Sequence, residues 1–339
     1  MGQIYLKVLV IMAVLFAFAV PGFVLKKLKF VGEGATYTLS NILLYVCQPA
    51  LAISAFCVFT PEEWEKVSAV PFTELLKNFG IVAGISFIAM ALMFGLCKLI
   101  FLRAKNRKKT DVYAFIAIFS NCGFLGVPFT EMLTDGDPLA VMYVMVFNVA
   151  FNILVWTLGV VLITGGFKEI RLKKLICNPS IISSILALVL FFVPQINFFM
   201  FAGLTDLQIF PRYLAHMTAP LSMIIVGIRL AESNLKELFC NAGIYLAGAL
   251  RLVIAPFLTF GVALAFMYMS GGVPDAGGYV FIAPVIAMAM SPAASVVAMA
   301  ERFDGDRKTA AHAFITITVL SVAVIPLTVS AVTAIWGTM

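Results

Sequence analysis

Apolar residues occur along this chain in long runs of about 20 residues, separated by short polar breaks. A helix of that length crosses the hydrocarbon core of a bilayer, whereas a membrane β-barrel needs alternating strands of about ten residues. The pattern therefore predicts an all-α polytopic membrane protein with ten transmembrane helices. The expected spans are 3–25, 36–58, 73–101, 111–133, 138–165, 179–196, 208–231, 239–269, 277–300 and 309–335.

Composition and charge agree with this class. Of the 339 residues, 62% are hydrophobic and 12% are charged, which leaves too little polar surface for a soluble domain. If the first connection is cytoplasmic, 18 of the 23 lysines and arginines fall on that side and four on the other, with Arg251 inside a span. The positive-inside rule then predicts a multi-pass plasma-membrane protein with both termini outside, and explains the net charge of +6 without nucleic acid.

Prolines recur at a similar separation in the two halves of the chain. Pro21 and Pro194 are 173 residues apart, and Pro49 and Pro220 are 171 apart. Pro128 and Pro292, 164 apart, form a third pair. The pairs predict two five-helix repeats, 1–165 and 178–339, joined by a short cytoplasmic linker at 166–177. Five is an odd number, so the second repeat enters the membrane from the opposite side, as in many secondary transporters.

Two of the apolar runs contain helix breakers. The fourth span carries Asn121, Gly123, Gly126 and Pro128 in "SNCGFLGVPF", and the ninth carries Ser291, Pro292 and Ser295 in "MAMSPAASV". Freed backbone groups survive in a membrane only inside protein or beside water. We expect the breaks to meet near the midplane. Pro128 and the Ser291-Pro292 pair would each begin a half-helix whose N-terminus binds an anion, with ordinary proline kinks as the alternative.

Other polar residues within the spans are weaker candidates. Arg251 in span eight is expected either to bind the carbonyl ends of helices or to bind a substrate anion. Tyr45, Gln48, Asn148 and Asn152 either line a cavity or join helices by hydrogen bonds. The broken spans carry polar but uncharged residues at their breaks, which favours an anion over a cation as substrate. The sequence contains no catalytic, nucleotide-binding or metal-ligating motif, so neither an enzyme nor a cofactor or metal site is predicted.

The stretch "SNCGFLGVPF", with its Asn-x-Gly-x-x-Gly-x-Pro spacing, resembles the signature of the auxin efflux carrier family, which includes the plant PIN carriers. The same family is similar elsewhere, in the same order, at "NPSIISSILAL", "TAPLSMIIVGIRLAE", "RLVIAPF" and "SPAASVVAMAERFDGD". The long hydrophilic central loop of the plant carriers is replaced here by a short basic one, as in prokaryotic members.

This resemblance implies two inverted five-helix repeats related to bile-acid symporters and sodium/proton antiporters, with broken helices 4 and 9 crossing. It also implies that Asn121 contacts a substrate carboxylate. The leading hypothesis is an elevator-type secondary transporter of a small organic anion such as malate, malonate or an auxin-like acid, coupled to a sodium, proton or substrate gradient. Related scaffolds often dimerise, so a homodimer is also expected. The alternatives are a sodium or proton antiporter of the same fold and a membrane sensor that binds a ligand without transporting it.

Overall fold

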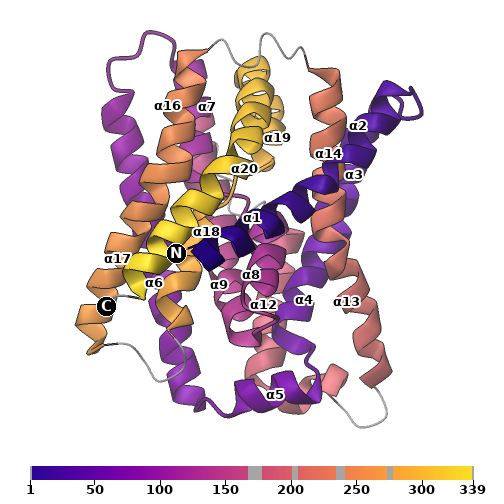
Figure 1. Ribbon diagram of the computed structural model, residues 1–339, viewed down its shortest axis with the longest axis vertical. Coiled ribbons are helices and arrows are strands. Elements are labelled where there is room, and N and C mark those ends of the chain that lie inside the picture. The colour runs from indigo at the N-terminus through magenta and orange to yellow at the C-terminus, as the bar shows by residue number, and fades with distance from the viewer. Residues whose placement is uncertain (1, 167–177, 201–204, 234–240, 273–277, 338–339) are drawn as a thin grey trace.

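A computed structural model describes residues 2–166, 178–200, 205–233, 241–272 and 278–337 (Figure 1). Within these ranges the regular structure is helical, and nearly all of the predicted linker lies outside them. Four π turns interrupt or join the α-helices, at Leu43–Cys47, Cys122–Gly126, Val155–Gly159 and Leu250–Ile254. The α-helices are α1 Gly2–Ala17, α2 Ala19–Lys27, α3 Ala35–Ile42, α4 Gln48–Cys57, α5 Pro61–Ser68, α6 Phe72–Ile100, α7 Arg107–Ile118, α8 Val127–Leu133, α9 Pro138–Leu154, α10 Val160–Thr164, α12 Pro179–Phe192, α13 Ile209–His216, α14 Thr218–Glu232, α16 Ala242–Ala249, α17 Ala255–Ser270, α18 Tyr279–Ala289, α19 Ser295–Arg302 and α20 Arg307–Trp336.

Seven helical segments in the described ranges are long and apolar enough to cross a membrane: Gly2–Lys27, Ala35–Cys57, Phe72–Ile100, Pro138–Thr164, Asp206–Glu232, Ala242–Ser270 and Arg307–Trp336. Three shorter apolar helices, Cys122–Leu133, Pro179–Phe192 and Tyr279–Ala289, fall within the predicted spans four, six and nine. The predicted class, a polytopic all-α membrane protein, is confirmed. The number ten stays a prediction because it depends on counting these three short helices as parts of spans.

The break in the fourth predicted span lies earlier than the sequence indicates. Helix α7 ends at Ile118, residues 119–121 are not helical, and a π turn then leads into α8. The expectation that Gly123, Gly126 and Pro128 unwind the chain is therefore wrong. Pro128 lies in the first turn of α8, where a missing backbone N–H is tolerated.

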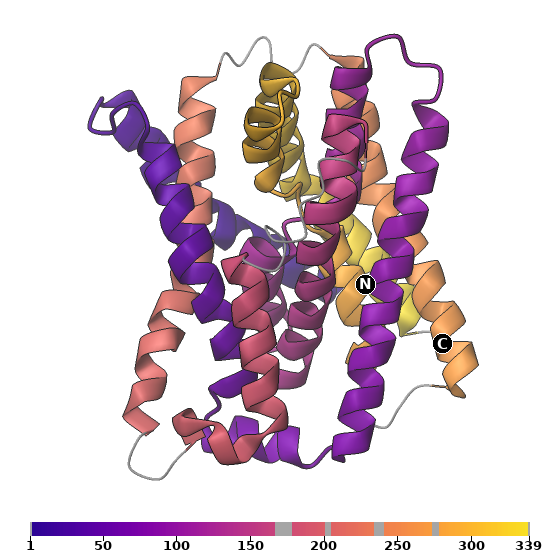
Figure 2. The same ribbon diagram turned by 180° about the vertical axis from the view of Figure 1, so that it is seen from behind.

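The ninth predicted span breaks where expected but restarts later. Helix α18 ends at Ala289 and α19 begins at Ser295, with Ala294 at its N-cap position. The expectation that Ser291 caps the new helix and Pro292 begins it is wrong, because Pro292 pairs with a residue of the other break. The two interrupted helices lie in the interior of the bundle, and residues 280–289 of α18 are all buried (Figures 1 and 2).

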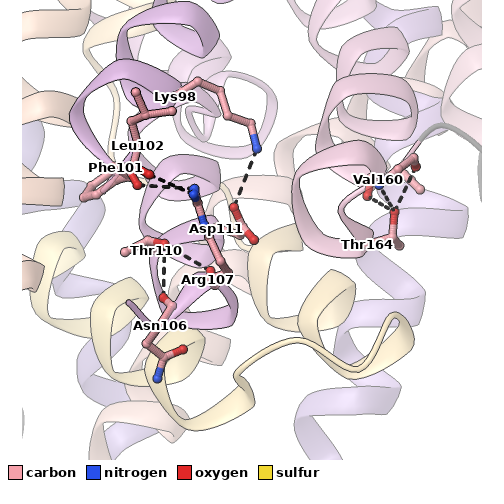
Figure 3. Close-up of polar contacts among 10 residues, drawn as sticks. Lys98, Phe101, Leu102, Asn106, Arg107, Thr110, Asp111, Val160 and Thr164 are labelled. Carbon is pink, nitrogen blue, oxygen red and sulfur yellow. Dashed lines mark hydrogen bonds and ion pairs between the residues drawn. The ribbon is translucent and has the colours of Figure 1, made fainter. Parts of the chain in front are cut away.

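The connections rich in basic residues gather at one end of the molecule. The end of α2, the α6–α7 connection, the end of α14 and the α19–α20 turn all lie there, whereas α5 and the start of α13 lie at the opposite end (Figures 1 and 2). Arg107 donates hydrogen bonds to the carbonyls of Phe101 and Leu102, 3.4 and 2.7 Å away, and Lys98 pairs with Asp111 at 3.7 Å (Figure 3).

A second contact at this end joins the start of α7 to the α19–α20 turn. Lys108 Nζ lies 2.6 Å from Asp304 Oδ2 and holds the pKa of that exposed carboxyl below its ordinary value. The clustering of basic connections agrees with the predicted cytoplasmic side. The orientation itself stays a prediction.

Helices α2 and α14 pack with their backbones in direct contact. A Cβ atom on Gly22 would overlap the carbonyl oxygen of Ile224, and one on Gly227 would overlap that of Ala19. A 2.7 Å ion pair between Lys26 and Glu232 joins α2 and α14 at the end where the basic connections lie. Glycine at these positions lets the two helices approach closely, as small residues do between membrane helices.

We predict that Gly227→Ala destabilises the protein, because the added methyl group must push α2 and α14 apart. Overpacking of this kind costs about 1 to 3 kcal/mol of folding free energy. The measurement is the thermal unfolding midpoint in detergent. Gly261→Ala in α17, where an added Cβ meets nothing within 4 Å, is the matched control and should unfold like the wild type. Equal midpoints for both variants would contradict the tight crossing.

Candidate functional site

The two extended links cross and pair through their backbones. Ser120 and Pro292 form an isolated antiparallel bridge. The N–H of Asn121 donates to the carbonyl of Ser291 at 2.7 Å, and the N–H of Ala293 donates to the carbonyl of Phe119 at 2.9 Å. Unwound backbone in the interior needs such partners, because an unsatisfied peptide group is costly there. The breaks thus meet, as expected from the sequence.

Arg251 binds the ends of both interrupted helices at this crossing. Its side chain is fully buried in the π turn between α16 and α17. It donates to the carbonyls of Ala117 and Ile118, at 3.1 and 2.8 Å, and to the carbonyl of Met288. These are terminal carbonyls of α7 and α18, where the helix dipoles place negative partial charge. Of the two expectations for Arg251, the structure supports binding to helix carbonyl ends.

Several polar groups beside the crossing have no hydrogen-bond partner among the described residues. The hydroxyls of Ser120, Ser291 and Ser295, the amide nitrogen of Asn148 and Nε of Arg251 are all buried and unpaired. A buried polar atom without a partner costs about 1 to 3 kcal/mol. Five such groups around one crossing indicate a place where water or a ligand completes the hydrogen bonding.

Two amide side chains press against the backbone of Gly123. A Cβ atom at Gly123 would lie 2.8 Å from Oδ1 of Asn148 and 3.2 Å from Nε2 of Gln48. Asn121, two residues away, is 5% exposed, and no hydrogen bond of its side chain is found in the described ranges. The structure therefore brings Asn121, Gly123, Gln48 and Asn148 together from three different helical segments.

The other predicted site residues have different surroundings. Asn152 donates from its side chain to the carbonyl of Asn148, 2.9 Å away, so its amide is engaged within α9. Tyr45 is 59% exposed on the outside of the molecule and does not belong to the buried group. A Cβ on Gly126 would meet Met290 at 3.3 Å, so this glycine serves the packing of the two breaks.

A pocket with a volume of about 160 Å³ opens beside the start of α8. It lies between α4, α5, α8, α9, α13 and α14, toward the end of the molecule opposite the basic connections (Figure 1). Val127 and Pro128, at the start of α8, are part of its wall, so the pocket reaches within about one helical turn of Gly123.

Four charged or titratable side chains line this pocket: Glu63, Glu131, Arg212 and His216. Arg212 Nη2 lies 3.0 Å from Oε2 of Glu63, and the same carboxylate accepts the N–H of Thr60 at 2.6 Å in a capping box at the start of α5. Sequence reasoning missed Ser120, although it adjoins Asn121, and missed Glu131 as a pocket residue. The pocket residues on α5 and α13 could not be identified from local sequence patterns, because only the tertiary packing brings them close to α8.

The sequence was also compared with known proteins. A sequence model of the family described as membrane transport protein matches residues 7–171 and 166–329, which is nearly the whole chain. The chain belongs to this family, that of the auxin efflux carriers. A Rhizobium meliloti protein named "Putative malonate transporter" is 24% identical over 301 residues, covering 85% of this chain and 84% of the relative. A Methanothermobacter thermautotrophicus protein named "Uncharacterized transporter" is 23% identical over 312 residues, covering 90% and 92%.

We predict that Arg251→Gln strongly destabilises this family member. The substitution leaves carbonyls of Ala117, Ile118 and Met288 without their donor, at about 1 to 3 kcal/mol for each orphaned group. Arg251→Lys keeps the charge but loses the planar fork, so it should fall between wild type and Gln. Thermal unfolding in detergent measures the effect, with the exposed Arg103→Gln as control. A Gln variant as stable as the control would contradict the role of Arg251.

Proposed function

We propose that this protein is a secondary transporter of a small organic anion that carries a carboxylate. The observation that carries the proposal is the distribution of charged and polar groups at the crossing. Arg251 occupies the negative C-terminal ends of α7 and α18, whereas the helices that follow the breaks begin beside unpaired hydroxyl and amide groups. Helix N-termini favour anions. Among the described residues, the buried polar and charged side chains include no aspartate or glutamate that would compete there.

The proposed substrate contacts come from the amide group at the first break. The NH₂ of Asn121 donates to a carboxylate oxygen, and Gln48 and the unpaired Nδ2 of Asn148 supply further donors next to Gly123. Carboxylates accept several hydrogen bonds at once, and those to charged groups are the stronger ones. The name of the Rhizobium meliloti relative makes malonate the first anion to test, with malate and an auxin-like acid next.

The proposed architecture has ten spans in two inverted repeats. Ser120 and Pro292, which pair, differ by 172 in residue number, close to the 173 and 171 of the first two proline pairs. Under the same shift α7, Arg107–Ile118, falls on residues 279–290, which matches α18 at Tyr279–Ala289. This relation supports the repeat and replaces the pairing of Pro128 with Pro292. In this inverted repeat, the three short apolar helices are parts of spans four, six and nine.

We further propose an elevator movement of the crossing against a scaffold. Helix α2 packs on α14, and α4 packs on α12 and α13, which together form the proposed scaffold. Helices α6, α9, α17 and α18 pack on one another around the crossing and form the proposed moving body. Helices α4 and α13 form one wall of the pocket, and α8 and α9 form the opposite wall. The proposed movement would open and close the pocket between these walls.

The proposed location is the plasma membrane, with the basic connections in the cytoplasm and both termini outside. In that orientation the pocket of the described conformation opens to the outside. A homodimer through the scaffold stays a prediction. The two rival functions, a sodium or proton antiporter of the same fold and a non-transporting ligand sensor, make different predictions for flux and are separated by the same assay.

Uptake of radiolabelled malonate, malate and indole-3-acetate into proteoliposomes tests the proposal. We expect saturable, gradient-dependent uptake of at least one of these acids. Sodium or proton exchange without carboxylate flux would favour the antiporter. Binding of an acid in a thermal-shift assay without any flux would favour the sensor.

We also predict that Asn121→Ala weakens the apparent affinity for the transported acid by roughly 10- to 100-fold, because a hydrogen bond to a charged group is lost. The unfolding midpoint should stay close to that of the wild type, since the Asn121 side chain has no partner among the described residues. Tyr45→Phe is the control and should transport normally, because Tyr45 faces outward. Unchanged affinity in the Asn121 variant would show that the site is misplaced.

A further inference from the structure

We propose that Phe124 forms an apolar seal that closes the path from the crossing to the basic end of the molecule, the end where the basic connections lie. The inference rests on the proposed transport of an anion by an elevator movement. Phe124 belongs to the π turn Cys122–Gly126 and directly follows Gly123, beside which the proposed substrate donors lie. The seal has to open whenever the anion is released at the basic end.

Phe124 packs into a small apolar cluster that is separate from the main hydrophobic core of the described residues. The members of this inner cluster are Leu39, Leu43, Cys47, Leu221, Ile225 and Phe124. Leu43, Cys47 and Ile225 are buried, and the other three pack around them. Phe124 comes from the crossing, whereas the other members come from α3, α14 and the π turn that leads into α4. The cluster therefore joins the crossing to the proposed scaffold.

The inner cluster lies on the side of the crossing that faces the basic end. Helix α14 runs from α13 toward Glu232, which pairs with Lys26 at the basic end (Figure 1). Ala219, near the start of α14, lines the pocket. Leu221 and Ile225, which follow it along α14, belong to the cluster. The interface with α14 is thus open at its outer part and closed farther in.

Two other chain segments show the same order. Cys47 belongs to the inner cluster, and Leu51, about one helical turn farther along α4, lines the pocket. After the first break, Phe124 belongs to the cluster, and Pro128, again about one turn farther, lines the pocket. Gln48, a proposed substrate donor, lies between the cluster residue and the pocket residue of its segment. The proposed anion site therefore lies at the boundary between the open and the closed part of this interface.

The π turn of the first break contacts both of the bodies that the elevator would move past each other. It packs on α9 and α18 of the proposed moving body, and it also packs on α14 of the scaffold. Leu125 is buried in the main hydrophobic core, whereas its neighbour Phe124 packs into the inner cluster. Adjacent side chains of one turn thus belong to two different clusters. Leu125 fixes the turn in the moving body, and Phe124 meets the scaffold.

An apolar cluster at this place holds back a carboxylate. A charged group that enters an apolar constriction loses its hydration and finds no hydrogen-bond partner there. Hydrophobic constrictions close pathways through membrane proteins in this way. Release at the basic end then requires that Phe124 leave Leu43 and Ile225. The strength of this contact therefore sets the balance between the conformation described here and one that is open at the basic end.

Cys47 reports the state of the seal in the wild-type protein. Its side chain is buried in the inner cluster, whereas Cys57, equally buried, donates to the carbonyl of Ala187 within the scaffold. In inside-out vesicles, where the basic connections face the reagent, a small membrane-impermeant maleimide should modify Cys47 during malonate exchange. Without malonate the modification should be at least about tenfold slower, because the open conformation is then a minor one. Peptide mass spectrometry measures both thiols, and Cys57 should stay unmodified throughout.

Substitutions on the two sides of the contact test the seal further. Phe124→Leu keeps an apolar side chain and should keep Cys47 protected. Phe124→Ser and Ile225→Ser should make Cys47 react roughly tenfold faster without malonate, because the apolar contact that favours the closed arrangement is lost. Ile182→Ser, at an exposed position of α12, is the matched control and should behave like the wild type.

Transport kinetics give a readout that a purely structural defect does not produce. In the serine variants the conformation open to the pocket side is less populated, so the apparent KM for malonate on that side should rise roughly tenfold. The KM on the basic side should not rise. A defect in folding or in the anion site would weaken binding on both sides. The double variant should show less than the sum of the single effects, because both substitutions remove the same contact.

The outcomes separate the seal from the proposed function. Protection of Cys47 during malonate exchange, or equal KM changes on both sides, overturns the seal and leaves anion transport intact. An absence of flux for any carboxylate in the wild type overturns the proposed function and, with it, a seal for anions. If Phe124→Ser does not fold, Ile225→Ser and the labelling of Cys47 in the wild type decide. Modification of Cys47 that depends on malonate in the wild type, but no longer in Ile225→Ser, supports the proposal.

Discussion

The arrangement at the centre of this protein depends on one buried guanidinium. Arg251 donates to the terminal carbonyls of α7 and α18, two helices that stop inside the bundle. A buried cation is costly unless it is well partnered, and so is a helix end without donors. At the crossing, the hydrogen bonds from Arg251 to these carbonyls reduce both costs. The two chain breaks can therefore persist in an apolar interior, with the Ser120–Pro292 bridge holding the extended links together.

This arrangement has a consequence for binding. Because Arg251 binds carbonyls at the C-terminal ends, the unpaired polar groups left at the crossing include hydroxyls and amides, which can donate as well as accept hydrogen bonds. Gly123 contributes by lacking a side chain, since Asn148 and Gln48 occupy the space where a Cβ would project. The pocket lies farther along α8, where Val127, Pro128 and Glu131 line it together with the Arg212–Glu63 pair.

Much of the chain was predictable because its signals are local. The long apolar runs required helices, and the positions of α6, α9 and α20 follow those runs closely. The breakers at 121–128 and 291–292 indicated two interruptions, and the lone Arg251 within an apolar run required an unusual partner. The position of each break was not predictable from residue type. Residue type places the unwound segment at the glycines and the proline, but Gly123, Gly126 and Pro128 follow the break, because backbone pairing with Ser291 and Ala293 fixes the extended residues.

The sequence by itself thus determined the class of the protein, the approximate helices, the existence of two interruptions and the residues able to line a site. The spacing of apolar residues, their hydropathy and the chemistry of proline act over a few residues, so they can be recognised in the sequence. Only the tertiary structure decided that Arg251 binds carbonyls, that Tyr45 faces outward, and that Gln48 and Asn148 converge on Gly123. It also decided that Arg212 and Glu131, 81 positions apart, share a pocket. Such contacts depend on the packing of distant helices, which no local pattern encodes.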